Sequence, residues 1–206
     1  MMIKLAYANV GNLNLSEAYK LLPESRKKKF DNFRFEKDKR LSAGAYLLLD
    51  ELLKEENITQ PAFKIGEYGK AYISNYENIY FNLSHSGKLV ACEISDMEIG
   101  VDVEYNDPEI DLNIAKNYFY NSEYENIMKS ENPSDEFFKY WVLKESYMKY
   151  TGLGFNLPLD SFEIIIDREI TLKNKKQPKF SLFDLEDYKL ATCSKNNVKS
   201  CFQHDL

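Results

Sequence analysis

The first part of the chain has apolar spacings that predict one strand followed by three helices. Residues 3–9 predict a strand, and Pro23 separates a short helix that Ser16 begins from a basic helix over residues 24–33. Residues 36–55 predict a longer helix, because apolar side chains recur there every three or four positions. The apolar stripe of this helix consists of Leu41, Ala45, Leu48, Leu49 and Leu52.

Short apolar or alternating runs follow, separated by turn-forming residues, and this pattern is typical of strands. The runs are 72–74, 79–83, 89–94 and 99–104. Helices are predicted next over 112–119, 123–128 and 136–151, the last ended by Gly152. Strands are predicted for the tail, over 162–167, 169–172, 179–183 and 188–193.

The predicted elements repeat in the same order, helices before strands, in both parts of the chain. This repetition predicts an α+β fold built of two similar, pseudo-symmetric α/β halves. We expect an N-terminal half over 1–101 and a C-terminal half over 102–206, with the functional site at their junction.

Composition narrows the class of protein. The chain has 206 residues, of which 44% are hydrophobic and 29% charged, as is typical of folded globular proteins. It contains no apolar run of the ~18–20 residues that a membrane span needs, and its first residues do not resemble a secretion signal. Three cysteines without a CxxC motif fit reduced thiols, so we expect a cytoplasmic location. With only two histidines, a bound metal is expected to be a hard cation held by carboxylates.

Charge is distributed unevenly along the chain. The net charge is −6, yet residues 26–40 hold eight Lys and Arg against three Asp and Glu. The acidic total disfavours a nucleic-acid partner, whereas the local basic segment suggests a small polyanionic ligand. The alternative is an ordinary solvated helix surface.

Two carboxylates share one face of the predicted strand over residues 99–104. Side chains alternate along a strand, so Asp102 and Glu104 point to one side and the valines between them to the other. Carboxylates so close together repel each other unless a cation lies between them. The alternative is an edge strand with a wet outer face.

The predicted helix over 136–151 places charged residues beside its apolar stripe. At helical spacing, the positions that continue the apolar stripe after Trp141 are occupied by the charged residues Glu145 and Lys149. Charges there are costly unless they are paired or coordinate a ligand. The alternative is a surface pair between Glu145 and Lys149, worth only ~0.2–0.5 kcal/mol.

A third candidate is the run from Phe81 to Gly87, where a strand enters a turn that carries His85. Neighbouring Ser and His side chains diverge on an extended backbone, and the G-x-S-x-G motif of nucleophilic serines is missing. Small residues would instead let backbone N–H groups approach an anion. The alternative is a histidine with a structural role in the turn.

Together these residues point to phosphate chemistry assisted by a metal ion. Asp102, Glu104 and Glu145 would supply oxygen ligands for Mg²⁺. Lys149 would reach a phosphate, and Lys70, His85 and the basic segment would hold further phosphates. These basic groups predict a ligand that contains a pyrophosphate and an additional phosphate group. The chain has no P-loop, dinucleotide fingerprint or kinase motifs, so a standard nucleotide-binding fold is not expected.

Several segments resemble the 4′-phosphopantetheinyl transferase family, in its longer, monomeric type. Ile-Gly-Val-Asp-Val-Glu (99–104), followed by Trp-Val-Leu-Lys-Glu-Ser-Tyr-Met-Lys (141–149), is similar to the family signature. Asn-Leu-Ser-His-Ser-Gly (82–87) matches its Ser-His-Ser-Gly loop. Gly-Lys-Ala-Tyr (69–72) resembles its Gly-Lys-Pro-Tyr turn, with Ala71 in place of proline. Segments 26–49 and 152–160 resemble the family in the same order.

The resemblance implies roles for single residues. Coenzyme A would lie between the halves, with Mg²⁺ on Asp102, Glu104 and Glu145 and with Lys149 on the phosphates. Glu145 is also the candidate general base. The remaining implied ligand contacts are the 3′-phosphate and nearby phosphates for Lys28, Arg40, Lys70 and His85, and the adenine or ribose for Ser84. Arg26, Lys27 and Lys29 stay alternatives to Lys28.

The implied reaction transfers 4′-phosphopantetheine from coenzyme A to a serine of an apo acyl- or peptidyl-carrier protein, releasing adenosine 3′,5′-bisphosphate. Mg²⁺ is the expected cofactor, and Mn²⁺ would substitute for it. Carrier contacts are expected near 112–120, and we expect a monomer without nucleic-acid or membrane partners. The alternatives are another Mg²⁺-dependent phosphoryl or nucleotidyl transferase and an inactive module that binds coenzyme A or a carrier.

Overall fold

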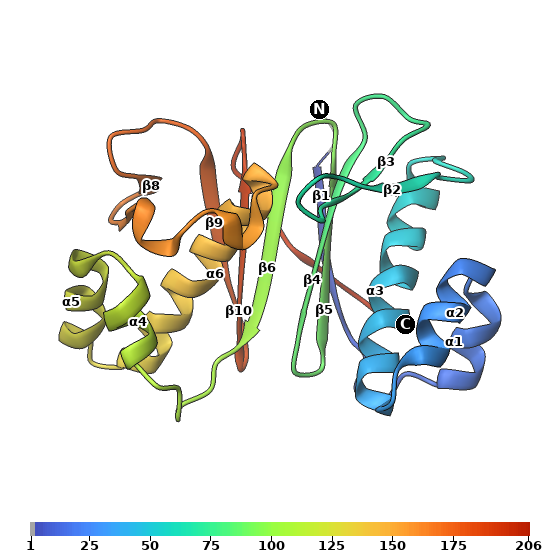
Figure 1. The fold of residues 1–206 in the computed structure, drawn as a ribbon, viewed down its shortest axis with the longest axis horizontal. Helices are drawn as coiled ribbons and strands as arrows, with labels where there is room; N and C mark the ends of the chain where they lie inside the picture. Colours follow the sequence, from blue (N-terminus) through green and yellow to red (C-terminus); the bar gives the residue numbers. More distant parts are fainter. Residues whose placement is uncertain (1–2) are drawn as a thin grey trace.

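The computed structural model describes residues 3–206, and its N-terminal part is built around a four-stranded sheet with the strand order β11-β1-β5-β4 (Figure 1). A small hairpin, β2–β3, lies beside it. The elements of this part are β1 (Ile3–Asn9), α1 (Leu15–Leu21), α2 (Glu24–Asn32), α3 (Glu36–Glu55), β2 (Phe63–Ile65), β3 (Ala71–Ile73), β4 (Tyr80–Ser86) and β5 (Leu89–Ser95).

The C-terminal part is built around a three-stranded sheet with the order β6-β10-β9, and it has its own small hairpin, β7–β8. Its elements are β6 (Ile99–Tyr105), α4 (Asn113–Tyr118), α5 (Asn121–Lys129), α6 (Pro133–Thr151), η1 (Gly154–Asn156), η2 (Leu159–Ser161), β7 (Ile164–Ile166), β8 (Ile170–Leu172), β9 (Lys179–Leu185), β10 (Tyr188–Ser194) and β11 (Phe202–His204). None of the helices formed by residues 3–206 has both the length and the apolar character needed to cross a membrane.

The predicted α+β class is confirmed, and the order of elements is the same in both parts. Each part has one strand, three helices, a two-stranded hairpin and two antiparallel strands. The corresponding sheets, β1-β5-β4 and β6-β10-β9, also share their strand order. Pseudo-symmetry of the two parts in space stays a prediction, as does their division at 101/102, a point that lies within β6.

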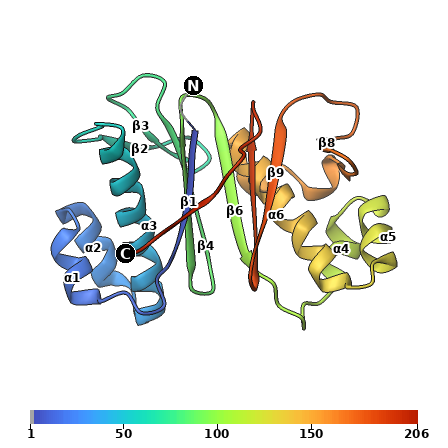
Figure 2. The ribbon, with the colours of Figure 1, turned by 180° about the vertical axis from the view of Figure 1, so that it is seen from behind.

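The end of the chain returns to the sheet in which the chain begins. Residues 202–204 pair in parallel with residues 6–8, so β11 lies beside β1. Figure 2 shows the segment after β10 crossing from the C-terminal sheet to the N-terminal one. His204 lies 3.5 Å from Glu51 of α3, and Val198 joins the apolar core between the two sheets. This crossing segment therefore links the two parts of the fold.

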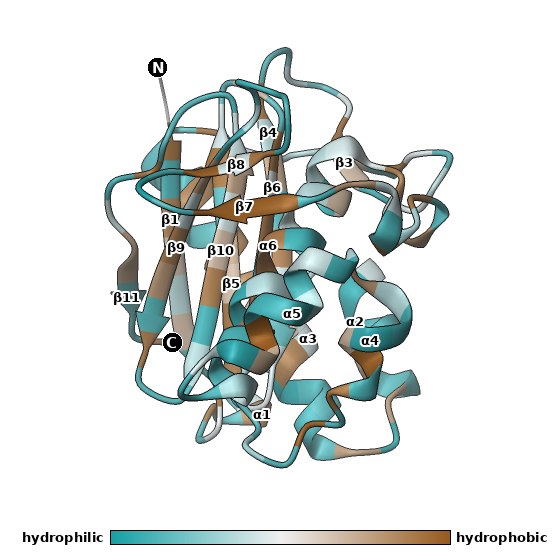
Figure 3. Ribbon diagram, turned by 90° about the vertical axis from the view of Figure 1, so that its left-hand side faces the viewer, coloured by the Kyte–Doolittle hydropathy of each residue, from teal (hydrophilic) through white to brown (hydrophobic). Residues whose placement is uncertain are grey.

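A long helix covers each sheet from the outside (Figure 1). The predicted apolar stripe of α3 is buried against the N-terminal sheet, where Leu48 and Leu49 are fully covered. Helix α6 packs on β6 and β10, with Val142 and Leu143 at its centre. Figure 3 shows β7, which consists of three isoleucines, as a hydrophobic strand beside largely hydrophilic loops. The sheets thus lie in the middle of the molecule, with the helices outside.

Local details differ from the sequence predictions at helix starts and in short strands. Asn14, not Ser16, caps α1, since its side chain accepts the backbone N–H groups of residues 16 and 17. Helix α5 begins at Asn121, two residues before the predicted start at 123, and the hydroxyl of Ser122 donates to Glu163 instead of capping a helix. The strands β2 and β11 were not predicted.

A buried ion pair ties α6 to the elements around it. Lys144 has no exposed surface, and its Nζ lies 2.8 Å from Glu123 of α5, which is 1% exposed. The same ammonium donates to the carbonyl oxygens of Leu159 and Phe162. Glu123 accepts in turn from the backbone N–H of Tyr120 and of Ile164. The pair therefore satisfies polar groups in four elements at once.

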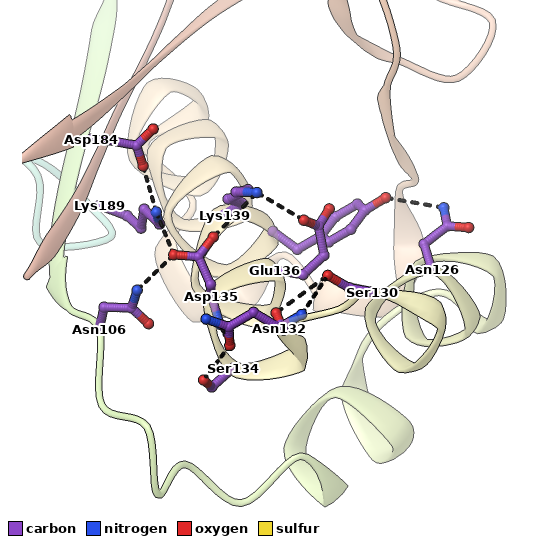
Figure 4. A network of polar contacts seen from close by, with 11 residues as sticks. Asn106, Asn126, Ser130, Asn132, Ser134, Asp135, Glu136, Lys139, Asp184 and Lys189 are labelled. Carbon is purple, nitrogen blue, oxygen red and sulfur yellow. Dashed lines mark hydrogen bonds and ion pairs between the residues drawn. The ribbon is translucent and has the colours of Figure 1, made fainter.

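The first turn of α6 is held by a second polar network, drawn in Figure 4. Asp135 accepts from Asn106 and forms ion pairs with Lys189 of β10 and with Lys139 of its own helix. Lys189 also pairs with Asp184 of β9. Asn132 caps the helix by accepting from the backbone N–H of Asp135. These contacts fix the start of α6 against the C-terminal sheet.

Glu93 is a fully buried acid between the two sheets. Thr192 of β10 donates a hydrogen bond to one of its oxygens, while its Oε1 has no partner. Burial raises the pKa of Glu93 from 4.5 to about 8, partly opposed by Thr192 and by the charge of Lys70. Glu93 therefore keeps its proton at neutral pH in the folded protein.

We expect Glu93→Gln to be more stable than the wild type at pH 8 and about as stable at pH 5. The raised pKa means that the wild type loses stability as pH rises from about 4.5 to about 8, and glutamine removes this loss. Denaturant unfolding of both proteins across this range measures the difference. An equal pH dependence of both proteins would show that Glu93 does not titrate in this way.

Candidate functional site

A very close approach of β6 and α6 forms the centre of the candidate site. A Cβ atom on Gly100 would lie 2.1 Å from the carbonyl oxygen of Ser146 and 2.3 Å from the backbone nitrogen of Tyr150. Only glycine permits this contact, because any side chain would push the helix away. The approach brings Asp102 of β6 beside Glu145 and Lys149 of α6.

Asp102, Lys149 and Ser84 form a tight polar cluster. The Nζ of Lys149 lies 2.7 Å from Asp102 Oδ1 and 2.9 Å from Ser84 Oγ. Ser84 Oγ donates to the same Asp102 oxygen at 2.8 Å. Asp102 is only 2% exposed, so the wet outer face that an edge strand would have is not present. Lys149 pairs with Asp102 rather than forming the alternative surface pair with Glu145.

Glu145 is partly buried, and its charge is poorly compensated. Its Oε1 and the Oδ2 of Asp102 are both buried without a hydrogen-bond partner. Burial raises the pKa of Glu145 to about 7, and repulsion from Asp102 adds to this effect, while Lys149 opposes it. Two unpartnered carboxylate oxygens beside each other are an arrangement that a bound cation would relieve.

Glu104 lies two residues along β6, at the edge of a cavity of about 390 Å³. Burial and repulsion from Asp102 raise the pKa of Glu104, whereas hydrogen bonds from Ser86 and Trp141 lower it. Phe138 and Ile114 also line the cavity. Glu104 thus faces an apolar recess next to the cluster.

The donor atoms that the site offers determine whether a divalent ion fits there. Among residues 3–206, no three His, Cys, Asp or Glu side chains are grouped so as to hold a metal ion by themselves. Mg²⁺ in phosphate-transfer sites commonly takes one or two carboxylates and completes its shell with phosphates and water. The free oxygens of Asp102 and Glu145 fit that smaller role.

A cavity of about 250 Å³, which we call the basic cavity, lies between α2, α3 and β4. Its polar lining includes the basic residues Arg26, Lys29 and His85 and a single acid, Asp38. The guanidinium of Arg26 lies 5.2 Å from the ring centroid of Tyr46. Loss of hydration, with the charges of Lys149 and Lys29, lowers the pKa of His85. The cavity therefore presents positive charge and exchangeable protons to a small anion.

The other basic residues proposed from the sequence are dispersed. Lys28 is exposed and does not line the basic cavity, while Lys27 pairs with Glu24. Arg40 lines a different cavity, together with Lys37 and Lys88, and bonds Glu36 and the carbonyl of Leu13.

Lys70 occupies the turn between β2 and β3. It pairs with Glu98 and donates to the carbonyl oxygen of Ile99. Lys70 and Lys149 also line a common cavity of about 280 Å³, together with Gly152. Apolar side chains such as Phe81 and Met148 also line this cavity, so it joins apolar surface to two lysines.

Comparisons with known proteins identify the family of the chain. Residues 98–193 match the family described as the 4′-phosphopantetheinyl transferase superfamily. The chain is 31% identical over 182 residues to the 4′-phosphopantetheinyl transferase Sfp of Bacillus subtilis strain 168, covering 84% of this chain and 81% of that protein.

Two further relatives match shorter regions. A 4′-phosphopantetheinyl transferase of Bacillus subtilis is 36% identical over 141 residues, which are 65% of this chain and 62% of the relative. The transferase gsp of Aneurinibacillus migulanus is 36% identical over 157 residues, 72% of this chain and 63% of the relative. The match thus spans less than two thirds of these two relatives. The chain belongs to the 4′-phosphopantetheinyl transferase family, and the resemblance noted in the sequence is confirmed.

Proposed function

We propose that this protein transfers the 4′-phosphopantetheine group of coenzyme A to a serine of an apo acyl- or peptidyl-carrier protein, releasing adenosine 3′,5′-bisphosphate. The relatives that match it carry the name of this transferase. The observation that carries the proposal is the cluster of Asp102, Glu145 and Lys149, placed between two cavities.

The proposed cofactor is Mg²⁺, for which Mn²⁺ would substitute. Asp102 and Glu145 would hold the ion through their unpartnered oxygens, and Glu104 is the third proposed ligand. When bound, such an ion neutralises charge on the pyrophosphate. We expect activity to be lost in excess chelator and restored by added Mg²⁺.

The chain's own groups would carry the remaining chemistry. Lys149 neutralises charge on the phosphate under attack, and its position on Asp102 and Ser84 keeps it within the site. Glu145 is the proposed base for the proton of the carrier serine. The nucleophile belongs to the carrier, so no activated serine or cysteine is required in this chain.

Two cavities would receive the nucleotide end of coenzyme A. The basic cavity takes the 3′-phosphate, and the cavity between Lys70 and Lys149 takes the adenosine part. The recess beside Glu104 and Trp141 would face the pantetheine arm and the incoming carrier. Carrier contacts are proposed near 112–120, where Tyr118 is 59% exposed.

The test is incubation of the protein with coenzyme A, Mg²⁺ and apo carriers of fatty-acid, polyketide and peptide synthesis. A carrier that gains the mass of one phosphopantetheine, with equimolar adenosine 3′,5′-bisphosphate, supports the proposal. Transfer of a nucleotidyl or a simple phosphoryl group would support the alternative, another Mg²⁺-dependent phosphoryl or nucleotidyl transferase. Binding of coenzyme A without any turnover would identify an inactive module. A monomeric state and a cytoplasmic location stay predictions.

Arg26→Met is expected to raise KM for coenzyme A about tenfold, the loss expected for one charge-assisted contact. Lys28→Met is the matched control, because Lys28 is exposed and lies outside the basic cavity. Steady-state kinetics with coenzyme A and with dephospho-coenzyme A measure both variants. The difference between KM for coenzyme A and KM for dephospho-coenzyme A should be smaller in Arg26→Met than in the wild type. If Lys28→Met raised KM for coenzyme A more than Arg26→Met did, the proposal that the basic cavity binds the 3′-phosphate would be wrong.

A further inference from the structure

The two sheets meet at strands β4 and β6, each of which is the outer strand of its own sheet. Side chains from β4 make the polar links between them. Asn82 accepts a hydrogen bond from the backbone N–H of Val101 at 2.8 Å, and Ser86 accepts one from the backbone N–H of Tyr105 at 3.1 Å. Because alternate residues of a strand share a face, the residue between them, Ser84, points the same way. This row of β4 side chains therefore fixes β6 against the other sheet.

Ser84 differs from its two neighbours, because it binds side chains of the candidate site rather than the backbone. Its hydroxyl donates to Asp102 Oδ1 at 2.8 Å and accepts from Lys149 Nζ at 2.9 Å. The residue is 7% exposed. A hydroxyl has one proton and two acceptor positions, so the only proton of Ser84 is used on Asp102.

These contacts make the two oxygens of Asp102 unequal. Oδ1 accepts from both Ser84 and Lys149, whereas the buried Oδ2 has no partner. Without Ser84, Asp102 would keep only one donor, and its carboxylate could rotate about the Cβ–Cγ bond. Lys149 would lose one of the two groups that hold its flexible side chain.

We propose that Ser84 is a positioning residue, which acts across the boundary between the sheets to fix the carboxylate of Asp102 and the ammonium of Lys149 in their working orientation. The proposal rests on the proposed transferase function. It differs from the role implied by the family resemblance, in which Ser84 contacts the adenine or ribose of the ligand. The two roles predict different kinetic effects.

The first test is the steady-state kinetics of Ser84→Ala. We expect kcat to fall roughly 10- to 100-fold, as for loss of a hydrogen bond to a charged group, while KM for coenzyme A changes little. Ser84→Thr keeps the hydroxyl and is expected to recover most of kcat. Ser95→Ala is the matched control, since Ser95 is fully buried in neighbouring β5 and accepts from Met97, away from the site.

The outcomes separate the possible roles of Ser84. A raised KM with an unchanged kcat would overturn the proposal in favour of ligand contact. Equal losses of melting temperature in Ser84→Ala and Ser95→Ala, with kcat unchanged in both, would reduce Ser84 to a structural role and also overturn it. A wild type that transfers nothing to any carrier would instead overturn the proposed function, independently of Ser84.

A second readout requires neither coenzyme A nor a metal ion. Lys149 is acetylated with acetic anhydride in the presence of chelator, and the rate is followed by peptide mass spectrometry. If Ser84 holds the ammonium in place, Lys149 should react faster in Ser84→Ala than in the wild type, Ser84→Thr or Ser95→Ala. Equal rates in all four proteins would show that Ser84 does not restrain Lys149, and would overturn the proposal.

Discussion

Glu145→Gln is expected to reduce phosphopantetheine transfer by at least ~100-fold, the typical loss for a general base, while the protein stays folded. Glutamine keeps the shape of the side chain but removes its charge and its ability to take a proton. Folding should be unchanged or improved, because the carboxylate of Glu145 is crowded by Asp102 and its Oε1 is buried without a partner. Transfer rate by intact mass and melting temperature, measured on the same preparation, test both parts.

Glu136→Gln provides the control for this experiment. Glu136 lies at the other end of α6, where its partly buried carboxylate pairs with Lys139 away from the candidate site, so its neutralisation should leave the transfer rate near that of the wild type. If Glu145→Gln transferred the group at a rate close to that of Glu136→Gln, Glu145 would be neither the base nor an essential ligand.

Lys144→Met is expected to lower the free energy of unfolding by about 3–5 kcal/mol, the range found when one partner of a buried ion pair is removed. The substitution leaves the carboxylate of Glu123 buried without its cation. It also removes the donor for the carbonyl oxygens of Leu159 and Phe162. Denaturant unfolding gives the change directly.

The double variant Lys144→Met/Glu123→Leu shows whether the unpaired charge causes the loss. It removes both charges from the interior but leaves the backbone N–H groups of Tyr120 and Ile164 without their acceptor, so it should recover part of the stability lost by Lys144→Met. Lys129→Met, which removes an exposed partner of Glu125, should cost less than ~1 kcal/mol. If Lys144→Met also lowered the free energy of unfolding by less than ~1 kcal/mol, the buried ion pair of Lys144 with Glu123 would not be important for stability.

The long elements were predictable because their side chains repeat over several turns. The 36–55 helix has the bounds predicted for it, and its leucine stripe is buried as expected. Strand β11 could not be found in this way, because Phe202, Gln203 and His204 owe their conformation to pairing with β1 rather than to their own pattern. Strand β11 therefore forms through contacts between residues that are distant in sequence, and the local spacing of side chains does not reveal such contacts.

The candidate site residues stay predictions, and the structure places two of them, Lys149 and Asp102, in direct contact. The strand and helix periods placed each side chain on a face of its own element, whereas the packing of α6 on β6 brought the two elements together. The basic residues follow one another along α2 and α3, where each step turns by about 100°. Arg26 therefore lines the basic cavity while Lys28 does not, and Arg40 turns toward a different cavity. A helical projection of residues 26–46 would have shown this separation.

The pairing of residues 202–204 with residues 6–8 also has a consequence for how the protein forms during synthesis. The N-terminal sheet gains its fourth strand only after residues 202–204 have been synthesised, long after β1. Until then one side of β1 keeps unpaired backbone groups, which are able to pair with another chain. Contacts between such distant residues form slowly, so the nascent protein is exposed to misassembly for longer. We therefore expect ribosome-bound chains that lack residues 202–204 to be more sensitive to proteolysis than released chains that contain them.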